Sequence, residues 1–143
     1  MRLICEFSEW AKPVGWALNK TRGGSRVRPK PLADYHRRIA DVCRIAMAGE
    51  PPYLGLVRME MDVFRVTPSG CRDGDPWGVT VEPDGKGGYV KKGLPTPDLG
   101  NVLKATEDAL QGIVIGDDAQ CSAHLPRRLY GPREGVVVRV YAL

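Results

Sequence analysis

This sequence has no long hydrophobic run, no closely spaced pair of cysteines and only two histidines, and each of these features excludes a class of protein. No stretch approaches the roughly 18 consecutive apolar residues that a membrane-spanning helix needs. Glu6 and Glu9 interrupt the N-terminal segment, where a secretory signal peptide needs an unbroken apolar run. We therefore expect a cytoplasmic protein without a membrane span.

The cysteines are too dispersed to indicate a disulfide framework or a metal site. The four are Cys5, Cys43, Cys71 and Cys121, and no two of them form a C-x-x-C pair. A structural zinc site needs clustered thiolates or imidazoles, and His36 and His124 are the only histidines. We expect reduced thiols that mostly serve as packing residues. Neither histidine is assigned a role.

Length and hydrophobic pattern predict one α+β (mixed α/β) domain spanning residues 1–143. The chain has 143 residues and 43% apolar residues, enough for one packed core. Apolar spacing predicts helices over 32–48 and from about Asp98, and strands over 2–10, 55–66, 119–129 and 136–141. A basic loop at 11–33 and a Gly/Pro-rich loop at 68–97, with a short hairpin through 79–81 and 89–90, complete the chain. We expect a mixed β-sheet flanked by two main helices.

Charge is unevenly distributed along the chain. Residues 11–44 contain nine basic residues and two acids, a net charge of +7, whereas 73–118 contain nine acids and four lysines, a net charge of −5. A basic arm beside an acidic cluster suits an enzyme that grips a polyanion and holds a cation. Alternatively, both runs are solvated surface, which is the commoner origin of such runs.

The segment 97–120 has the pattern most suggestive of chemistry. On a helical wheel, Asp98, Asn101, Lys104 and Asp108 share one polar face, while Val102, Leu103, Ala109 and Leu110 occupy the other. Thr96 is the expected N-cap and Pro97 the expected first helical residue. Asp117 and Asp118 follow after a short turn, and an antiparallel return would bring them back towards Asp98.

Clustered carboxylates of this kind have two interpretations. They repel one another unless they are protonated, separated by water or bridged by a cation, and oxygen ligands suit Mg²⁺ or Mn²⁺. Such an ion stabilises a pentacovalent phosphate and helps to generate a hydroxide nucleophile, while a nearby lysine neutralises phosphate charge. In the second interpretation, Asp98 complements the helix dipole and Asp117–Asp118 is a polar turn.

The same segment resembles the signature of the RusA family of Holliday-junction resolvases, small endonucleases common in phages and prophages. The matching residues, in order, are Asp98, Asn101, Lys104, Asp108-Ala109-Leu110, Gly112, Asp117-Asp118 and Gln120. The resemblance implies a homodimeric, Mg²⁺- or Mn²⁺-dependent endodeoxyribonuclease that makes paired nicks in four-way DNA junctions during recombination and repair. A two-fold symmetric junction needs two active sites, which an isologous dimer supplies.

The resemblance also implies roles for individual residues. Asp98 and Asp118 become metal-binding carboxylates, Asp117 a supporting acid at the metal, and Lys104 the catalytic lysine. The supporting residues of the motif are Asn101, Asp108 and Gln120. Gly100 departs from the pattern, because it stands where the family has a second acid. Either Asp108, Asp62 or Glu60 replaces that acid, or the protein is a catalytically impaired junction-binding protein.

If the substrate is DNA, the basic residues gain a function. Those expected to contact phosphates are Lys20, Arg22, Arg26, Arg28, Lys30, Arg127 and Arg128. Trp10, Trp16 and Tyr35 could stack on unpaired bases, but burial is the commoner fate of such aromatic residues.

Overall fold

The computed structural model describes residues 1–15, 19–20, 26–27, 29–93 and 98–143. Its helices are α1 (Lys30–Met47) and α2 (Leu99–Leu110), and a 3-10 turn, η1, covers Asp118–Gln120. The strands are β1 (Arg2–Glu9), β2 (Asn19–Lys20), β3 (Arg26–Val27), β4 (Val57–Val66), β5 (Thr80–Pro83), β6 (Tyr89–Lys92), β7 (Cys121–Gly131) and β8 (Gly135–Ala142). Neither helix in these residues has the length and hydropathy of a membrane span.

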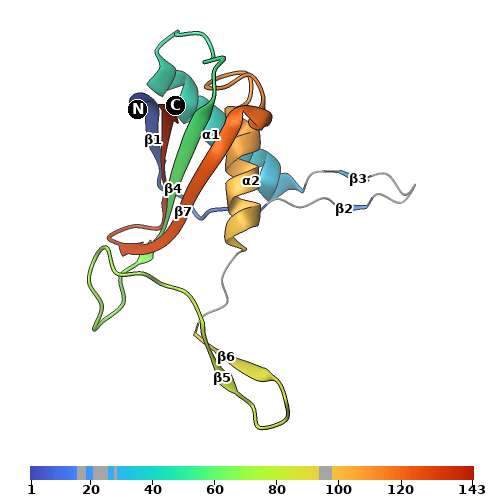
Figure 1. The fold of residues 1–143 in the computed structure, drawn as a ribbon, viewed down its shortest axis with the longest axis vertical. Coiled ribbons are helices and arrows are strands. Elements are labelled where there is room, and N and C mark those ends of the chain that lie inside the picture. Colours follow the sequence, from blue (N-terminus) through green and yellow to red (C-terminus); the bar gives the residue numbers. More distant parts are fainter. Residues whose placement is uncertain (16–18, 21–25, 28, 94–97) are drawn as a thin grey trace.

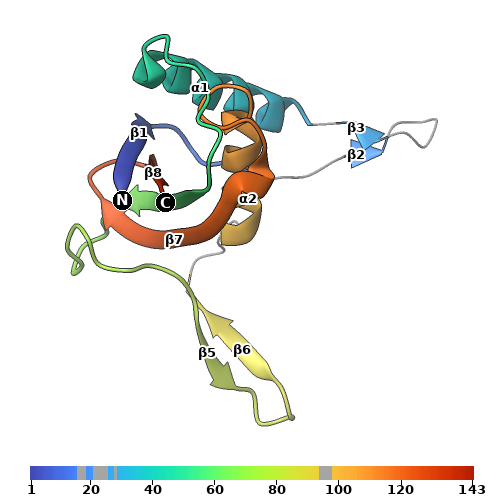
Figure 2. The same ribbon diagram turned by 45° about the horizontal axis from the view of Figure 1, so that its top comes forward.

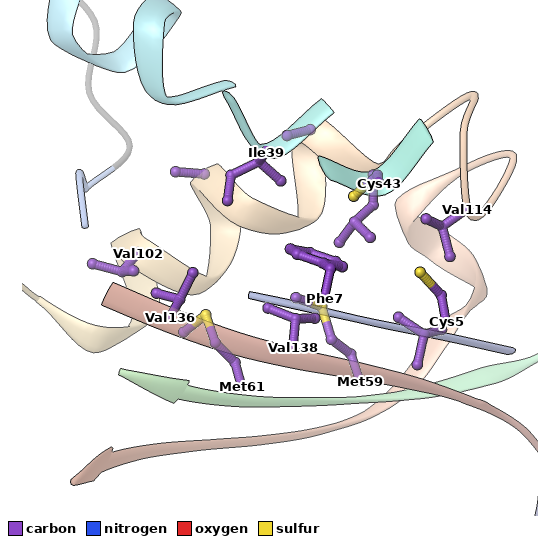
Figure 3. Close-up of a cluster of buried hydrophobic side chains, with 14 of the residues drawn as sticks. Cys5, Phe7, Ile39, Cys43, Met59, Met61, Val102, Val114, Val136 and Val138 are labelled. Carbon is purple, nitrogen blue, oxygen red and sulfur yellow. The ribbon is translucent and has the colours of Figure 1, made fainter. Parts of the chain in front are cut away.

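Four strands form one mixed sheet in the order β1-β8-β4-β7. β4 pairs with β7 in parallel and with β8 antiparallel, and β8 also pairs antiparallel with β1. Figures 2 and 3 show both helices over the same face of this sheet. The predicted fold class, a mixed sheet with two helices in a small α+β protein, is confirmed.

The core lies between the helices and that face of the sheet. Alternate residues of β4, among them Met59 and Met61, are fully buried, as period-two alternation predicts. Ile39 and Cys43 of α1 meet them from the helix layer (Figure 3). Tyr35 is also fully buried, and its hydroxyl lies 2.8 Å from Thr106 Oγ1 on α2. Tyr35 is therefore a core residue rather than a base-stacking one.

The two long loops contain short hairpins. β5 and β6 overlap the hairpin predicted through 79–81 and 89–90 but each extends two residues further along the chain, and every residue of both strands is exposed (Figure 1). In the basic region 11–33, predicted as a long loop, β2 and β3 pair with each other and α1 begins at Lys30. Pro31 fits the first turn of α1, where a missing N–H leaves no hydrogen bond unmade.

The cysteines are free, as predicted. Cys5 and Cys43 are buried packing residues, Cys121 is half-buried and Cys71 is exposed. Burial raises the pKa of the Cys5 thiol to about 11. A thiol with so high a pKa is a poor nucleophile, which is consistent with a packing role.

Candidate active site

α2 begins at a different cap from the one predicted. Asp98 is the N-cap, and its Oδ1 accepts a hydrogen bond from the Asn101 backbone N–H at 3.0 Å. The prediction of Thr96 as the cap is wrong, and Thr96 and Pro97 themselves lie outside the described residues. Because Asp98 precedes the first helical residue, its side chain does not belong to the polar stripe of the helical wheel. Asp98 lies immediately before the stripe, at the start of the helix.

The amphipathic pattern of α2 itself is confirmed. Asn101 and Lys104 are exposed and Asp108 is half-buried, whereas Val102 and Ala109 pack into the core. The polar stripe is therefore accessible to a ligand over most of the helix.

The turn after α2 holds the second group of acids. Asp117 caps η1, because its Oδ1 accepts a hydrogen bond from the Ala119 N–H at 2.8 Å. Gln120 fixes this turn to the body of the protein. Its side-chain amide donates to the carbonyls of Tyr53 and Gly55 at 2.9 and 2.8 Å, and its Oε1 accepts from two backbone N–H groups in the turn. These four bonds set the position of the exposed Asp118.

Replacing Gln120 with alanine is expected to lower the free energy of unfolding by about 2–3 kcal/mol, since each internal hydrogen bond contributes about 0.5–1.5 kcal/mol. Urea denaturation of the two proteins measures this loss. Gln111→Ala is the matched control, because the Gln111 amide donates one side-chain bond, to Asp108 at 3.3 Å. Equal losses in both variants would contradict the anchoring role of Gln120.

Asp98 and Asp118 lie at opposite ends of α2. Figure 1 shows the chain entering α2 at one end and continuing into β7 from beyond the other, and η1 lies between these two elements in the chain. Glu107 is nine positions after Asp98, which corresponds to roughly 13 Å along the helix axis. Asp118 is on the Glu107 side, because η1 leads directly into Cys121, whose Sγ lies within 4.8 Å of a Glu107 carboxylate oxygen. The prediction that the return brings Asp117 and Asp118 back towards Asp98 is therefore wrong within one chain.

Glu107 and its neighbours form an acidic cluster that the sequence did not reveal. Burial raises the pKa of the Glu107 carboxyl above its ordinary value, and the nearby charges of Asp118 and Asp108 raise it further, whereas the hydrogen bond with His124 acts in the opposite direction. His124 Nε2 lies 2.5 Å from Glu107 Oε2. The half-buried Cys121 belongs to the same group, since burial, then the charges of Glu107 and Asp118, raise the pKa of its thiol to about 12.

Two of the candidates to replace the acid missing at Gly100 already have basic partners. Asp62 is only 4% exposed, and its two oxygens accept hydrogen bonds from Arg127 at 2.7 and 3.0 Å. Glu60 forms an ion pair with Arg58. Both acids alternate with the core residues of β4, so they project from the sheet face opposite α2. Only Asp108 of the three belongs to α2.

The predicted DNA contacts are spread over several elements. Lys30 is exposed and forms a 3.6 Å ion pair with Asp34. Lys20 and Arg26 pair through their backbones as parts of β2 and β3, while Arg22 and Arg28 lie outside the described residues, as does Trp16.

On the sheet, two predicted DNA contacts have protein partners. Arg127 is held by Asp62, and the Arg128 guanidinium lies 5.5 Å from the centre of the Trp77 ring. Trp10 is 38% exposed and packs on Phe64, with ring centroids 5.9 Å apart.

The fold and the exposed acids define a small α+β protein with carboxylates at both ends of one helix and a lysine between them. A comparison with protein families finds that the model described as endodeoxyribonuclease RusA matches residues 13–141. The chain therefore belongs to the RusA endodeoxyribonuclease family, whose members are nucleases that resolve Holliday junctions. A comparison with curated proteins finds no match.

Proposed function

We propose that this protein is a Mg²⁺- or Mn²⁺-dependent endonuclease that nicks four-way DNA junctions in recombination and repair. The family match supports the proposal most strongly, because it covers nearly the whole chain. The exposure of Asp98, Asn101, Lys104 and Asp118 supports it further, since a phosphodiester could reach each of them.

The proposed metal ligands are the carboxylates of Asp98, Asp117 and Asp118. All are exposed oxygen donors, and the charges of Asp118 and Asp108 both act on Glu107, so the acids at this end of α2 fit a hard divalent cation. Such an ion, when bound, polarises the phosphate and favours hydroxide as the nucleophile. Lys104 would hold the phosphate and offset its developing negative charge. Asn101 and Gln120 support the two ends of the site.

The distance between the two ends of α2 has a consequence for the assembly. Ligand oxygens on one Mg²⁺ lie about 2.0–2.1 Å from the ion, so two of them are at most about 4.2 Å apart. Within one chain, Asp98 caps the start of α2 and Asp118 follows its far end, so the length of the helix keeps the two carboxylates from sharing one ion. We infer that the protein acts as a homodimer in which Asp98 lies beside Asp118 of the partner subunit. An isologous two-fold arrangement then creates two equivalent sites, one for each nick.

The basic residues named above are the proposed DNA-binding surface. Lys20, Arg22, Arg26, Arg28 and Lys30 precede or begin α1, and Arg127 and Arg128 lie on β7. Contacts of this type position the duplex without reading its sequence, and they make affinity strongly dependent on salt.

Substitutions at Asp98 separate its capping role from its proposed metal role. Asp98→Ala removes the cap and is expected to lower the free energy of unfolding by about 1 kcal/mol. Asp98→Asn retains a good cap, so its stability should stay within about 0.5 kcal/mol of wild type. Both variants are expected to lose nicking. Nicking by Asp98→Asn at the wild-type rate would show that Asp98 serves as a cap alone.

A junction cleavage assay tests the proposed function. The purified protein is incubated with a synthetic four-way junction or a linear duplex of the same sequence, with Mg²⁺, Mn²⁺ or EDTA. We expect paired nicks in the junction with either metal, and an intact linear duplex. Nicking that persists in EDTA would overturn the metal mechanism.

Gly100 favours a second candidate function, a junction-binding protein with impaired catalysis. A glycine has no side-chain oxygen, so one metal ligand of the family is missing at this position. This candidate predicts tight, salt-sensitive junction binding without cleavage in the same assay.

A further inference from the structure

We propose that Glu107, Cys121 and His124 form a binding site for a borderline-soft divalent transition-metal ion such as Zn²⁺, adjacent to the proposed Mg²⁺ ligand Asp118 but with three ligands of its own. One ligand atom from each residue lies within 4.8 Å of the other two, and no other such triad occurs in the part of the chain that the structure describes. The three residues come from α2 and β7, so a bound ion would join the helix to the edge strand of the sheet.

A β-bulge places the two proposed metal ligands of β7, Cys121 and His124, on the strand face that the helices cover. Side chains of a regular strand alternate between faces, so residues three apart would point in opposite directions. Here Val57 pairs with Cys121 while Arg58 pairs with Ala123, which leaves Ser122 as an extra residue. Cys121 and His124 therefore share one face of the strand. Their partners on β4, Val57 and Met59, are both fully buried on the side that the helices cover.

The spacing of the donors suits tetrahedral coordination. Zn²⁺ binds carboxylate oxygen and imidazole nitrogen at about 2.0–2.2 Å and thiolate sulfur at about 2.3 Å, so two ligands of one ion lie about 3.3–3.8 Å apart. Because the ligand atoms of the triad lie within 4.8 Å of one another, coordination requires shifts of at most about 1.5 Å. Glu107 Oε2 and His124 Nε2, now 2.5 Å apart, would separate by a similar amount. Rotation of exposed or half-buried side chains can supply such movements.

The chemistry of the donors selects the class of metal. Sulfur and imidazole nitrogen favour Zn²⁺ and related ions, whereas Mg²⁺ takes oxygen ligands. The site is shielded but reachable, because the Glu107 side chain is 14% exposed and that of His124 is 32% exposed. Asp118 and Asp108 add negative charge around Glu107, which attracts a cation. Three protein ligands leave a fourth position for water.

Zinc binding to the full-length protein tests the proposal, with Co²⁺ as the spectroscopic probe. We expect one Zn²⁺ per chain by calorimetry, and a thiolate-to-metal charge-transfer band with Co²⁺. Zn²⁺ at about a hundredfold excess over its Kd should raise the Tm by roughly 5–10 °C. Cys121→Ser should abolish the band, and Glu107→Gln and His124→Gln should each weaken Zn²⁺ binding at least tenfold.

Cys71→Ser is the matched control, because Cys71 is a free, exposed thiol in the loop between β4 and β5 and does not belong to the triad. It should bind Zn²⁺ and Co²⁺ as wild type does. The Tm of each metal-free variant confirms that its fold is intact. The proposal is wrong if millimolar Zn²⁺ does not bind, if Cys121→Ser keeps the charge-transfer band, or if Cys71→Ser loses it. These results do not depend on DNA cleavage, so they are independent of the proposed nuclease function.

Discussion

Replacing Asp118 with asparagine is expected to reduce junction nicking by at least about a hundredfold to a thousandfold, the scale typical of losing one group that stabilises charge in a transition state. The substitution removes a proposed metal ligand while keeping the size of the side chain. Asp118 is exposed, so the free energy of unfolding should change by no more than about 0.5 kcal/mol. Single-turnover cleavage of a labelled junction measures the first effect, and urea denaturation the second.

Asp41→Asn is the control for Asp118→Asn. Asp41 is an exposed aspartate on α1 that pairs with Arg44 at 3.2 Å. Its loss changes the net charge of the protein equally without touching the proposed site. Wild-type nicking by Asp118→Asn, or an equal loss in Asp41→Asn, would remove Asp118 from the mechanism.

Introducing an acid at Gly100 is expected to increase nicking at least tenfold at limiting Mg²⁺. Gly100 is the second residue of α2, where a negative charge interacts favourably with the helix dipole and aspartate has a higher helix propensity than glycine. A Cβ at this position would lie 3.2 Å from Asp98 Oδ1, so the new carboxylate of Gly100→Asp would sit beside the proposed ligand. The cap would need to move by a few tenths of an ångström. Initial nicking rates over a Mg²⁺ titration measure the gain.

Gly100→Asn separates the effect of the added negative charge from the effect of a higher helix propensity at this position. It has nearly the shape of Gly100→Asp and a similar Cβ contact, but it contributes no carboxylate. A gain in Gly100→Asp alone supports a metal role at this position. An equal gain in both variants would mean that the start of the helix, rather than metal binding, limits the activity.

Local sequence pattern predicts most of the fold. The three- and four-residue spacing that includes Tyr35, Ile39 and Cys43 identifies α1, because these side chains fall on one face of a helix. The alternation through Met59 and Met61 identifies β4 in the same way. Such periods depend on neighbouring residues, so they can be read without knowledge of the tertiary structure.

Features that depend on distant residues are not predictable in this way. The direction of the chain after α2 depends on Gln120, which bonds to carbonyls more than 60 residues earlier. The local sequence also does not show that Asp98 rather than Thr96 is the N-cap of α2, since both residue types cap helices well. The spacing of Cys121 and His124 was visible in the sequence, but only the bulge at Ser122 places both on one face.

Mixed dimers of Asp98→Asn and Asp118→Asn chains test the central claim, that one metal centre forms between two protomers. Each variant alone has lost both sites. In a mixed dimer, one site keeps Asp98 from one chain and Asp118 of the partner subunit, so co-expressed chains should nick one junction strand at least tenfold faster than either variant alone. If the mixed dimers are as inactive as the separate variants, no shared centre of this kind exists.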